Sequence, residues 1–231
     1  MVKIDLNKIN RKVTLVLTTT VYINEHLHWL FQRNSDDRKN IYLKAIKQWL
    51  EKTDLPICLV ENSGYEYNEL NEYKEKYKDR FEVIGYNEKT LPESQHLKAS
   101  VSKGQCELFA LNYAYDHSRL INESDFIIKI TGRYFIPKLE NYLETTDLTK
   151  YYCLHQNNGD RCELVGVNNF FFKKIFKKDM LDKSGIFTPH MESYLSNWRK
   201  TIIGKHKILQ CPLFEIENTK NGGHDEPMIN I

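Results

Sequence analysis

The chain has 231 residues, which is enough for one large α/β domain or for a domain with a small appendage. Its formal net charge of +2 provides no basic field for attracting nucleic acid, so we expect no nucleic-acid partner. The five cysteines form no Cys-x-x-Cys pair, which argues against a zinc cluster and predicts buried, reduced thiols. The apolar run at 13–17 is too short for a secretion signal or a transmembrane segment, and a cytoplasmic location is expected.

Strand and helix patterns alternate over the first 136 residues. Apolar runs at 13–17, 56–60, 81–85 and 126–130 predict four strands. Helical spacing predicts helices at 36–52, 69–78 and 104–118, with Ser35 or Asp36 capping the first. This order predicts a mostly parallel central sheet with right-handed crossovers and helices on both faces.

Polar residues follow several of these strands directly. Thr18, Thr19 and Thr20 follow the first strand, and Glu61 and Asn62 follow the second. The carboxyl ends of parallel strands meet at one edge of a sheet, where ligands bind. No Gly-x-Gly-x-x-Gly or Gly-x-x-x-x-Gly-Lys-Ser/Thr loop occurs, so a dinucleotide dehydrogenase and a P-loop NTPase are disfavoured.

The pattern changes after Pro137. Strands are predicted at 151–155, 164–172 and 208–214, and helices at 173–181 and 189–199. The glycine-containing tail at 218–231 is predicted to be a loop. No repeat or linker divides the chain, so a single domain over 1–231 is expected.

Three short segments carry a resemblance to a known family. The segment Lys129-Ile130-Thr131-Gly132-Arg133-Tyr134 resembles a signature of GT-A-like glycosyltransferases from bacteria and large viruses. Lys103-Gly104-Gln105-Cys106-Glu107 and Asp160-Arg161-Cys162-Glu163 are similar to further segments of that group. Without the resemblance, the first segment is an ordinary core strand followed by a turn.

The resemblance implies a GT-A-like, Rossmann-like domain. Residues 1–136 would form its nucleotide-sugar-binding half and 137–231 its acceptor-side half. The implied activity moves a sugar from a UDP-, GDP- or dTDP-linked donor to a hydroxyl of a surface glycan or glycoprotein, as in polysaccharide biosynthesis. The setting would be the cytoplasm of a bacterium or of a virus-infected host.

The donor diphosphate would need a positive partner, which most GT-A enzymes supply as a divalent cation held by Asp-x-Asp. The sequence contains no Asp-x-Asp, so Arg133 is the candidate for this role and metal dependence stays open. Lys103 and Gly104 begin a helix, where backbone N–H groups favour anions. The full set of candidate donor-binding residues is Thr18, Thr19, Thr20, Glu61, Asn62, Lys103, Gly104, Lys129, Thr131, Gly132, Arg133 and Tyr134.

The transfer step would need a base, for which Glu192 is the candidate and Asp160 the rival. His224 and Asp225 in the tail are candidate metal ligands. Each of these side chains has a plainer interpretation as a helix cap, a solvated carboxylate or a solvated histidine. Two other functions stay open: a sugar-phosphate nucleotidyltransferase, and a noncatalytic carbohydrate-binding protein with the same fold.

Overall fold

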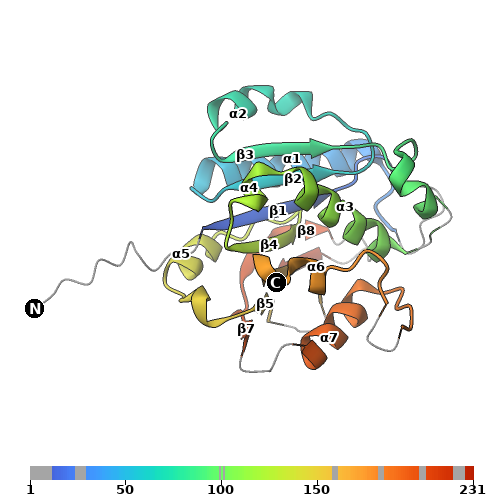
Figure 1. The fold of residues 1–231 in the computed structure, drawn as a ribbon. Coiled ribbons are helices and arrows are strands. Elements are labelled where there is room, and N and C mark those ends of the chain that lie inside the picture. Colours follow the sequence, from blue (N-terminus) through green and yellow to red (C-terminus); the bar gives the residue numbers. More distant parts are fainter. Residues whose placement is uncertain are drawn as a thin grey trace, which may run out of the picture.

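The computed structural model describes residues 12–23, 30–98, 100, 102–157, 161–181, 185–202, 207–220 and 227–231. A seven-stranded sheet forms its centre, in the order β3-β2-β1-β4-β6-β5-β7 (Figure 1). Its strands are β1 (Val13–Thr19), β2 (Ile57–Glu61), β3 (Phe81–Gly85), β4 (Phe126–Thr131), β5 (Cys153–His155), β6 (Leu164–Asn168) and β7 (Ile208–Gln210). The first four strands are parallel, and β6 runs antiparallel to both β4 and β5. The predicted α/β fold with a mostly parallel sheet is confirmed.

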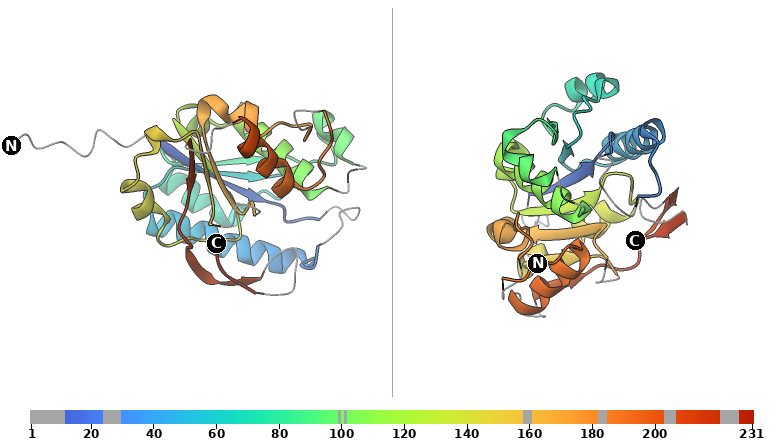
Figure 2. Two further views of the ribbon diagram at one scale, coloured as in Figure 1. Left: turned by 90° about the horizontal axis from the view of Figure 1, so that it is seen from below. Right: turned by 90° about the vertical axis from the view of Figure 1, so that its right-hand side faces the viewer.

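Helices cover both faces of the sheet (Figure 2). The longer helices are α1 (Ser35–Lys52), α3 (Lys103–His117) and α7 (Met191–Ile202). The shorter elements are η2 (Asn68–Leu70), α2 (Asn71–Lys76), η3 (Pro92–Leu97), α4 (Arg119–Asn122), α5 (Leu139–Glu144), η4 (Leu148–Lys150), η5 (Asn169–Phe171) and α6 (Phe172–Ile175). In the described residues, no helix combines the length and the apolar composition that crossing a membrane requires.

The alternation of side chains along β1 divides the core into two layers. Leu15 and Leu17 pack in one cluster with Trp49 of α1, whereas Val16 packs in another with Leu108 of α3. Trp49 is fully buried, and its indole N–H donates to the backbone carbonyl of Tyr134 at 2.8 Å. The residues that follow β4 are therefore fixed against α1.

Several local predictions are wrong, and the strands predicted at 164–172 and 208–214 end at Asn168 and Gln210. The cap of α1 is Asn34, whose side chain accepts from the N–H of Asp37, rather than Ser35 or Asp36. The helix predicted at 173–181 is shortened to α6, because the chain leaves helical geometry at Phe176. The tail contains a hairpin of β8 (Glu215–Lys220) and β9 (Pro227–Asn230), which packs Ile216 and Ile231 into the core beside α1. The burial of these apolar side chains therefore stabilises strands in a segment whose composition predicts a loop.

Candidate functional site

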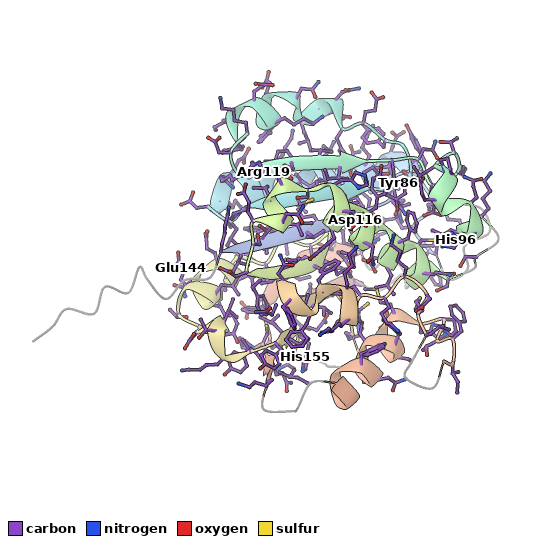
Figure 3. The ribbon with its side chains drawn as sticks, viewed as in Figure 1. Tyr86, His96, Asp116, Arg119, Glu144 and His155 are labelled. Carbon is purple, nitrogen blue, oxygen red and sulfur yellow. The ribbon has the colours of Figure 1, made fainter. Side chains whose placement is uncertain are left out.

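A cavity of about 440 Å³ opens at the carboxyl ends of β1, β2 and β4. Tyr86, which follows β3, lies toward this end of the sheet, and Glu144 of α5 lies toward the other end (Figure 3). Most of the residues singled out in the sequence line the cavity: Thr18, Thr19, Thr20, Asn62, Lys103, Gly104, Thr131, Arg133, Tyr134 and Glu192. The polar ends of separate strands therefore meet at one place.

Gly132 allows the ends of β1 and β4 to lie close together. Thr18 is paired with Thr131 across the two strands, and the N–H of Gly132 donates to the carbonyl of Thr18 at 2.9 Å. A Cβ atom on Gly132 would lie 2.8 Å from that carbonyl oxygen and 2.6 Å from Cγ2 of Thr19. The glycine of the signature is required by this close approach.

Lys129 lies beneath the cavity with its ammonium group fully hydrogen bonded. Its Nζ is 2.8 Å from Oε1 of Glu107, and it donates to the carbonyl of Cys162 at 2.6 Å and to Oγ1 of Thr131 at 3.1 Å. Burial alone would lower the pKa of Lys129, but Glu107, Cys162 and Glu163 together outweigh burial and the pKa rises to about 12. An ammonium has three donors, so Lys129 acts as a buried support for Glu107, Thr131 and Cys162.

Glu107 lines the cavity, although it is not among the candidate residues selected from the sequence. Its Oε1 accepts from the hydroxyl of Thr18 at 2.6 Å as well as from Lys129. The carboxylate therefore joins α3 to β1 and β4 at the point where the strands end. Because its charge is balanced by Lys129, Glu107 adds little net negative charge to the cavity.

Arg133 has the opposite character, because its charge has no counter-ion in the described part of the chain. The side chain is only 8% exposed, and Nη1 donates to Oε1 of Gln32 at 3.1 Å and to the carbonyl of Lys220 at 3.4 Å. Both partners are neutral oxygens. A buried guanidinium on the wall of a cavity is suited to an anionic ligand, since burial of an unpaired charge is costly.

A chain of hydrogen bonds lines the part of the cavity next to β2. The hydroxyl of Thr20 donates to Oδ1 of Asn62 at 2.6 Å, and Nδ2 of Asn62 donates to Oε2 of Glu88 at 3.0 Å. Burial raises the pKa of Glu88. These contacts fix the orientation of the Asn62 amide and bring in Glu88, which lies three residues beyond β3.

Glu61 lies behind the cavity wall rather than on it. It is fully buried, and its Oε1 accepts from the N–H groups of Ser63 at 2.8 Å and Val21 at 3.4 Å and from the Ser63 hydroxyl. Its Oε2 has no hydrogen-bond partner in the described residues, and burial raises its pKa. In this structure Glu61 holds the loop that follows β1.

The start of α3 packs against the start of α7. Ser102 caps α3, because its side chain accepts from the N–H of Gln105 at 3.2 Å. A Cβ on Gly104 would lie 2.9 Å from both the N and the Cβ of Met191. Gly104 therefore permits close packing that carries the first turn of α7, and with it Glu192, to the cavity.

Glu192 lies in the first turn of α7 and accepts a hydrogen bond from the thiol of Cys162 at 3.4 Å. Cys162 precedes β6, and because β6 is antiparallel to β4, residues before the strand reach this edge. Asp160, His224 and Asp225 lie outside the described residues. Within the described ranges, no group of three or more His, Cys, Asp or Glu side chains is arranged to hold a metal ion.

Several wall residues were absent from the sequence-based set, namely Arg38, Tyr42, Glu88, Glu107, Cys162 and Glu163. Three of them, Glu107, Cys162 and Glu163, could have been selected from the sequence, because they belong to the segments that carry the resemblance. Arg38 and Tyr42 gave no such signal, since both belong to an amphipathic helix pattern.

Comparisons with known proteins support the fold. No protein-family model matches the sequence, and no curated protein matches it significantly. The structure of the glycosyltransferase GlyE from Streptococcus pneumoniae TIGR4 is similar, with a TM-score of 0.51, 11% identity, and coverage of 87% of this chain and 45% of that chain. The apo form of GlyE gives a TM-score of 0.52 at 10% identity, covering 88% and 45% of the two chains.

A putative nucleotide-diphospho-sugar transferase from Desulfovibrio desulfuricans G20 gives a TM-score of 0.46 at 13% identity, covering 87% of this chain and 80% of that chain. The chain spans less than half the length of GlyE. Because the sequence identity to GlyE is so low, the similarity is evidence for the fold alone. The protein has a mixed α/β fold of the GT-A-like type.

Proposed function

We propose that the protein is a glycosyltransferase that moves a sugar from a nucleoside diphosphate sugar to a hydroxyl of a surface glycan or glycoprotein. The proposal rests on the position of Arg133, whose buried guanidinium lies just beyond the end of β4 on the wall of the cavity. Its partners in the described residues are neutral oxygens, so its charge is available to a bound anion. A UDP-, GDP- or dTDP-linked sugar presents such an anion in its diphosphate.

The polar chain of Thr20, Asn62 and Glu88 is the proposed contact for the base and ribose. It lies on the side of the cavity formed by β1 and β2, within the proposed nucleotide-binding half at 1–136. Thr131 and Arg133 would then meet the diphosphate, since Thr131 ends β4 and Arg133 lies two residues beyond it, at the adjacent strand end.

The sugar and the acceptor would occupy the side of the cavity formed by the later half of the chain, 137–231. Cys162, Glu163 and Glu192 line that side. We propose Glu192 as the base that takes the proton from the acceptor hydroxyl, because its carboxylate lies on the wall and is held by the Cys162 thiol. Asp160 remains the rival candidate for the same role.

A divalent cation is the usual partner of the donor diphosphate in this fold. β4 ends in Thr131 and is followed by Gly132 and Arg133, which supply a positive charge and no carboxylate, so these three residues do not fit a metal ion. In the proposal, Arg133 takes over charge neutralisation as the nucleoside diphosphate leaves. His224 and Asp225 from the tail form the alternative, in which a cation is held together with the donor phosphates.

Calorimetric titration with UDP, GDP, dTDP and their sugar conjugates tests donor binding, and release of nucleoside diphosphate tests turnover. Arg133→Ala is expected to weaken nucleotide binding by about 1.5–3 kcal/mol, and Arg133→Lys should restore only part of it. Arg119→Ala, at the other end of the sheet, is the matched control with unchanged affinity. Activity should persist in EDTA.

Absence of any nucleotide binding at millimolar concentration would reject the proposal. Binding of sugars without turnover would favour a noncatalytic carbohydrate-binding protein. Complete loss of activity in EDTA, together with unchanged affinity in Arg133→Ala, would transfer the charge-neutralising role to the tail.

A further inference from the structure

A second arginine, Arg38 of α1, lines the same cavity and is only 4% exposed. Its Nε donates to the carbonyl of Thr20 at 2.7 Å, its Nη1 to the carbonyl of Gln32 at 3.2 Å, and its Nη2 to the hydroxyl of Tyr42 at 2.7 Å. All of these acceptors are neutral. No carboxylate in the described ranges forms an ion pair with Arg38, although the side chain is buried.

Arg38 and Arg133 share their surroundings. The Cζ atom of Arg38 lies 5.5 Å from the centre of the Tyr42 ring, and that of Arg133 lies 5.8 Å from it. Gln32 contacts both guanidinium groups, through its backbone carbonyl to Arg38 and its side-chain oxygen to Arg133. Burial is the main cause that lowers the pKa of Arg38, and the nearby charge of Arg133 lowers it further, whereas Tyr42 and Glu61 act in the opposite direction.

This arrangement is unfavourable by itself. Two like charges repel, and burial removes the water that would otherwise screen them. The Tyr42 ring and the carbonyl oxygens carry no net charge, and Glu61, which acts on Arg38 without an ion pair, has its own pKa raised by burial, so these groups offset only part of that cost. Arg133 uses Nη1 alone for hydrogen bonds within the described residues, which leaves Nε and Nη2 for another partner.

We propose that Arg38 and Arg133 together form a site for two linked phosphoryl groups, with Arg38 as a second phosphate-binding residue contributed by α1. One guanidinium faces each phosphoryl group, and Tyr42 and Gln32 hold the pair in place. The ligand chemistry is a diphosphate, which could be free pyrophosphate or part of a nucleotide. Its assignment to a sugar donor rests on the proposed function, whereas the anion site rests on the two arginines.

Two charges in the site predict selectivity for diphosphate over monophosphate. Isothermal titration of the wild-type protein with inorganic pyrophosphate and with inorganic phosphate tests this directly. We expect pyrophosphate to bind at least about ten-fold more tightly, because each guanidinium gains a charge-assisted contact. Equal affinity for the two anions would overturn the inference without the use of any variant.

Arg38→Gln separates phosphate binding from a merely structural role. We expect it to weaken the binding of pyrophosphate, UDP, GDP or dTDP about ten-fold to hundred-fold, and to leave the affinity for the matching nucleoside unchanged. If Arg38 only holds Thr20 and Gln32, the nucleoside and the diphosphate lose affinity by the same factor, and that result overturns the inference. Arg38→Lys, which keeps the charge, should retain part of the pyrophosphate affinity.

Arg80 provides a matched control for these variants. It also donates to backbone carbonyls, those of Leu55 at 3.2 Å and Leu50 at 2.6 Å, but it precedes β3 at the other end of the sheet. Arg80→Gln should leave pyrophosphate affinity unchanged. Pyrophosphate binding that depends on Arg38, without turnover of any nucleotide sugar, would reject the proposed function and support this inference. Turnover of a nucleotide sugar, with unchanged diphosphate affinity in Arg38→Gln, would support the proposed function and reject this inference.

Discussion

Lys129 of β4 and Glu107 of α3 form an ion pair of 2.8 Å at the base of the cavity, with Lys129 fully buried and Glu107 22% exposed. The pair joins the sheet to the helix that covers it. Each residue belongs to a different segment of the resemblance, so two short motifs that are separate in sequence form one contact.

The losses of stability on removal of the two members of this pair should not be additive. Glu107→Gln is expected to lower the free energy of unfolding by about 3 kcal/mol, because it leaves the Lys129 ammonium buried without its counter-ion. The double variant Glu107→Gln/Lys129→Met should lose less than the sum of the two single losses. Urea unfolding of the four proteins measures the coupling, and strictly additive losses would contradict it.

The pair also predicts a pH dependence. The folded-state pKa of Lys129 is raised to about 12 from an ordinary value of 10.5, so the charged form is favoured by folding. The stability that it contributes is complete below about pH 10.5 and is lost as the pH rises toward 12. Urea unfolding between pH 8 and 11.5 should show this loss in the wild type and a smaller loss in Lys129→Met.

Gly132→Ala should disrupt the junction of β1 and β4, because the new Cβ would lie 2.8 Å from the Thr18 carbonyl oxygen. We expect a loss of about 1–3 kcal/mol in unfolding free energy, together with weaker ligand binding, as the strand ends move apart. Gly85→Ala is the control, since a Cβ there would meet nothing within 4 Å. Thermal unfolding and nucleotide titration of both variants test this prediction. Equal stability and equal nucleotide affinity of the two variants would contradict the steric argument.

Glu61→Gln should be tolerated and should flatten the dependence of stability on pH. Burial raises the folded-state pKa of Glu61, so its contribution is favourable below the unfolded-state pKa of about 4.3 and is lost as the pH rises through the folded-state value. The neutral amide avoids that loss at neutral pH. Urea unfolding from pH 5 to 8 should show a smaller change of stability with pH in Glu61→Gln than in the wild type. Glu75→Gln, an exposed change on α2, should behave as wild type.

Glu192→Gln should leave nucleotide affinity nearly intact and reduce sugar transfer by roughly 100-fold or more, the usual effect of losing a general base. The structure supports the choice through the position of Glu192 on the cavity wall beside Cys162. Steady-state kinetics and titration of the same preparation separate the two effects. Wild-type turnover would transfer the role to Asp160 or remove the need for a side-chain base.

The sequence predicts the sheet well because its strands are short, apolar runs that end in polar residues. Thr18 and Asn62 were selected by that rule, and they meet at the cavity. The rule does not extend to β6, since the antiparallel direction of this strand places the preceding residues, Cys162 and Glu163, at the same edge. Strand direction depends on tertiary pairing and is not encoded in a local pattern.

Arg38 shows why part of the site was missed. It follows Asp36 and Asp37 in a charged helix start, where arginine is normally solvated. Only the packing of α1 beside β1 and the loop at Thr20 buries it. Lys129 differs, because a lysine within an apolar strand already indicates an unusual environment, although its partner on α3 cannot be read from spacing.

The five cysteines are all buried and none forms a disulfide, as predicted, and this makes them internal reporters of opening. Burial raises the pKa of the Cys58 thiol to about 12 and also raises that of Cys162, so a labelling reagent meets little thiolate. Cys106 and Cys162 line the cavity, whereas Cys58 lies within the sheet. Alkylation rates followed by mass spectrometry would therefore distinguish local opening of the cavity from global unfolding, and an occupant of the cavity would slow the first without changing the second.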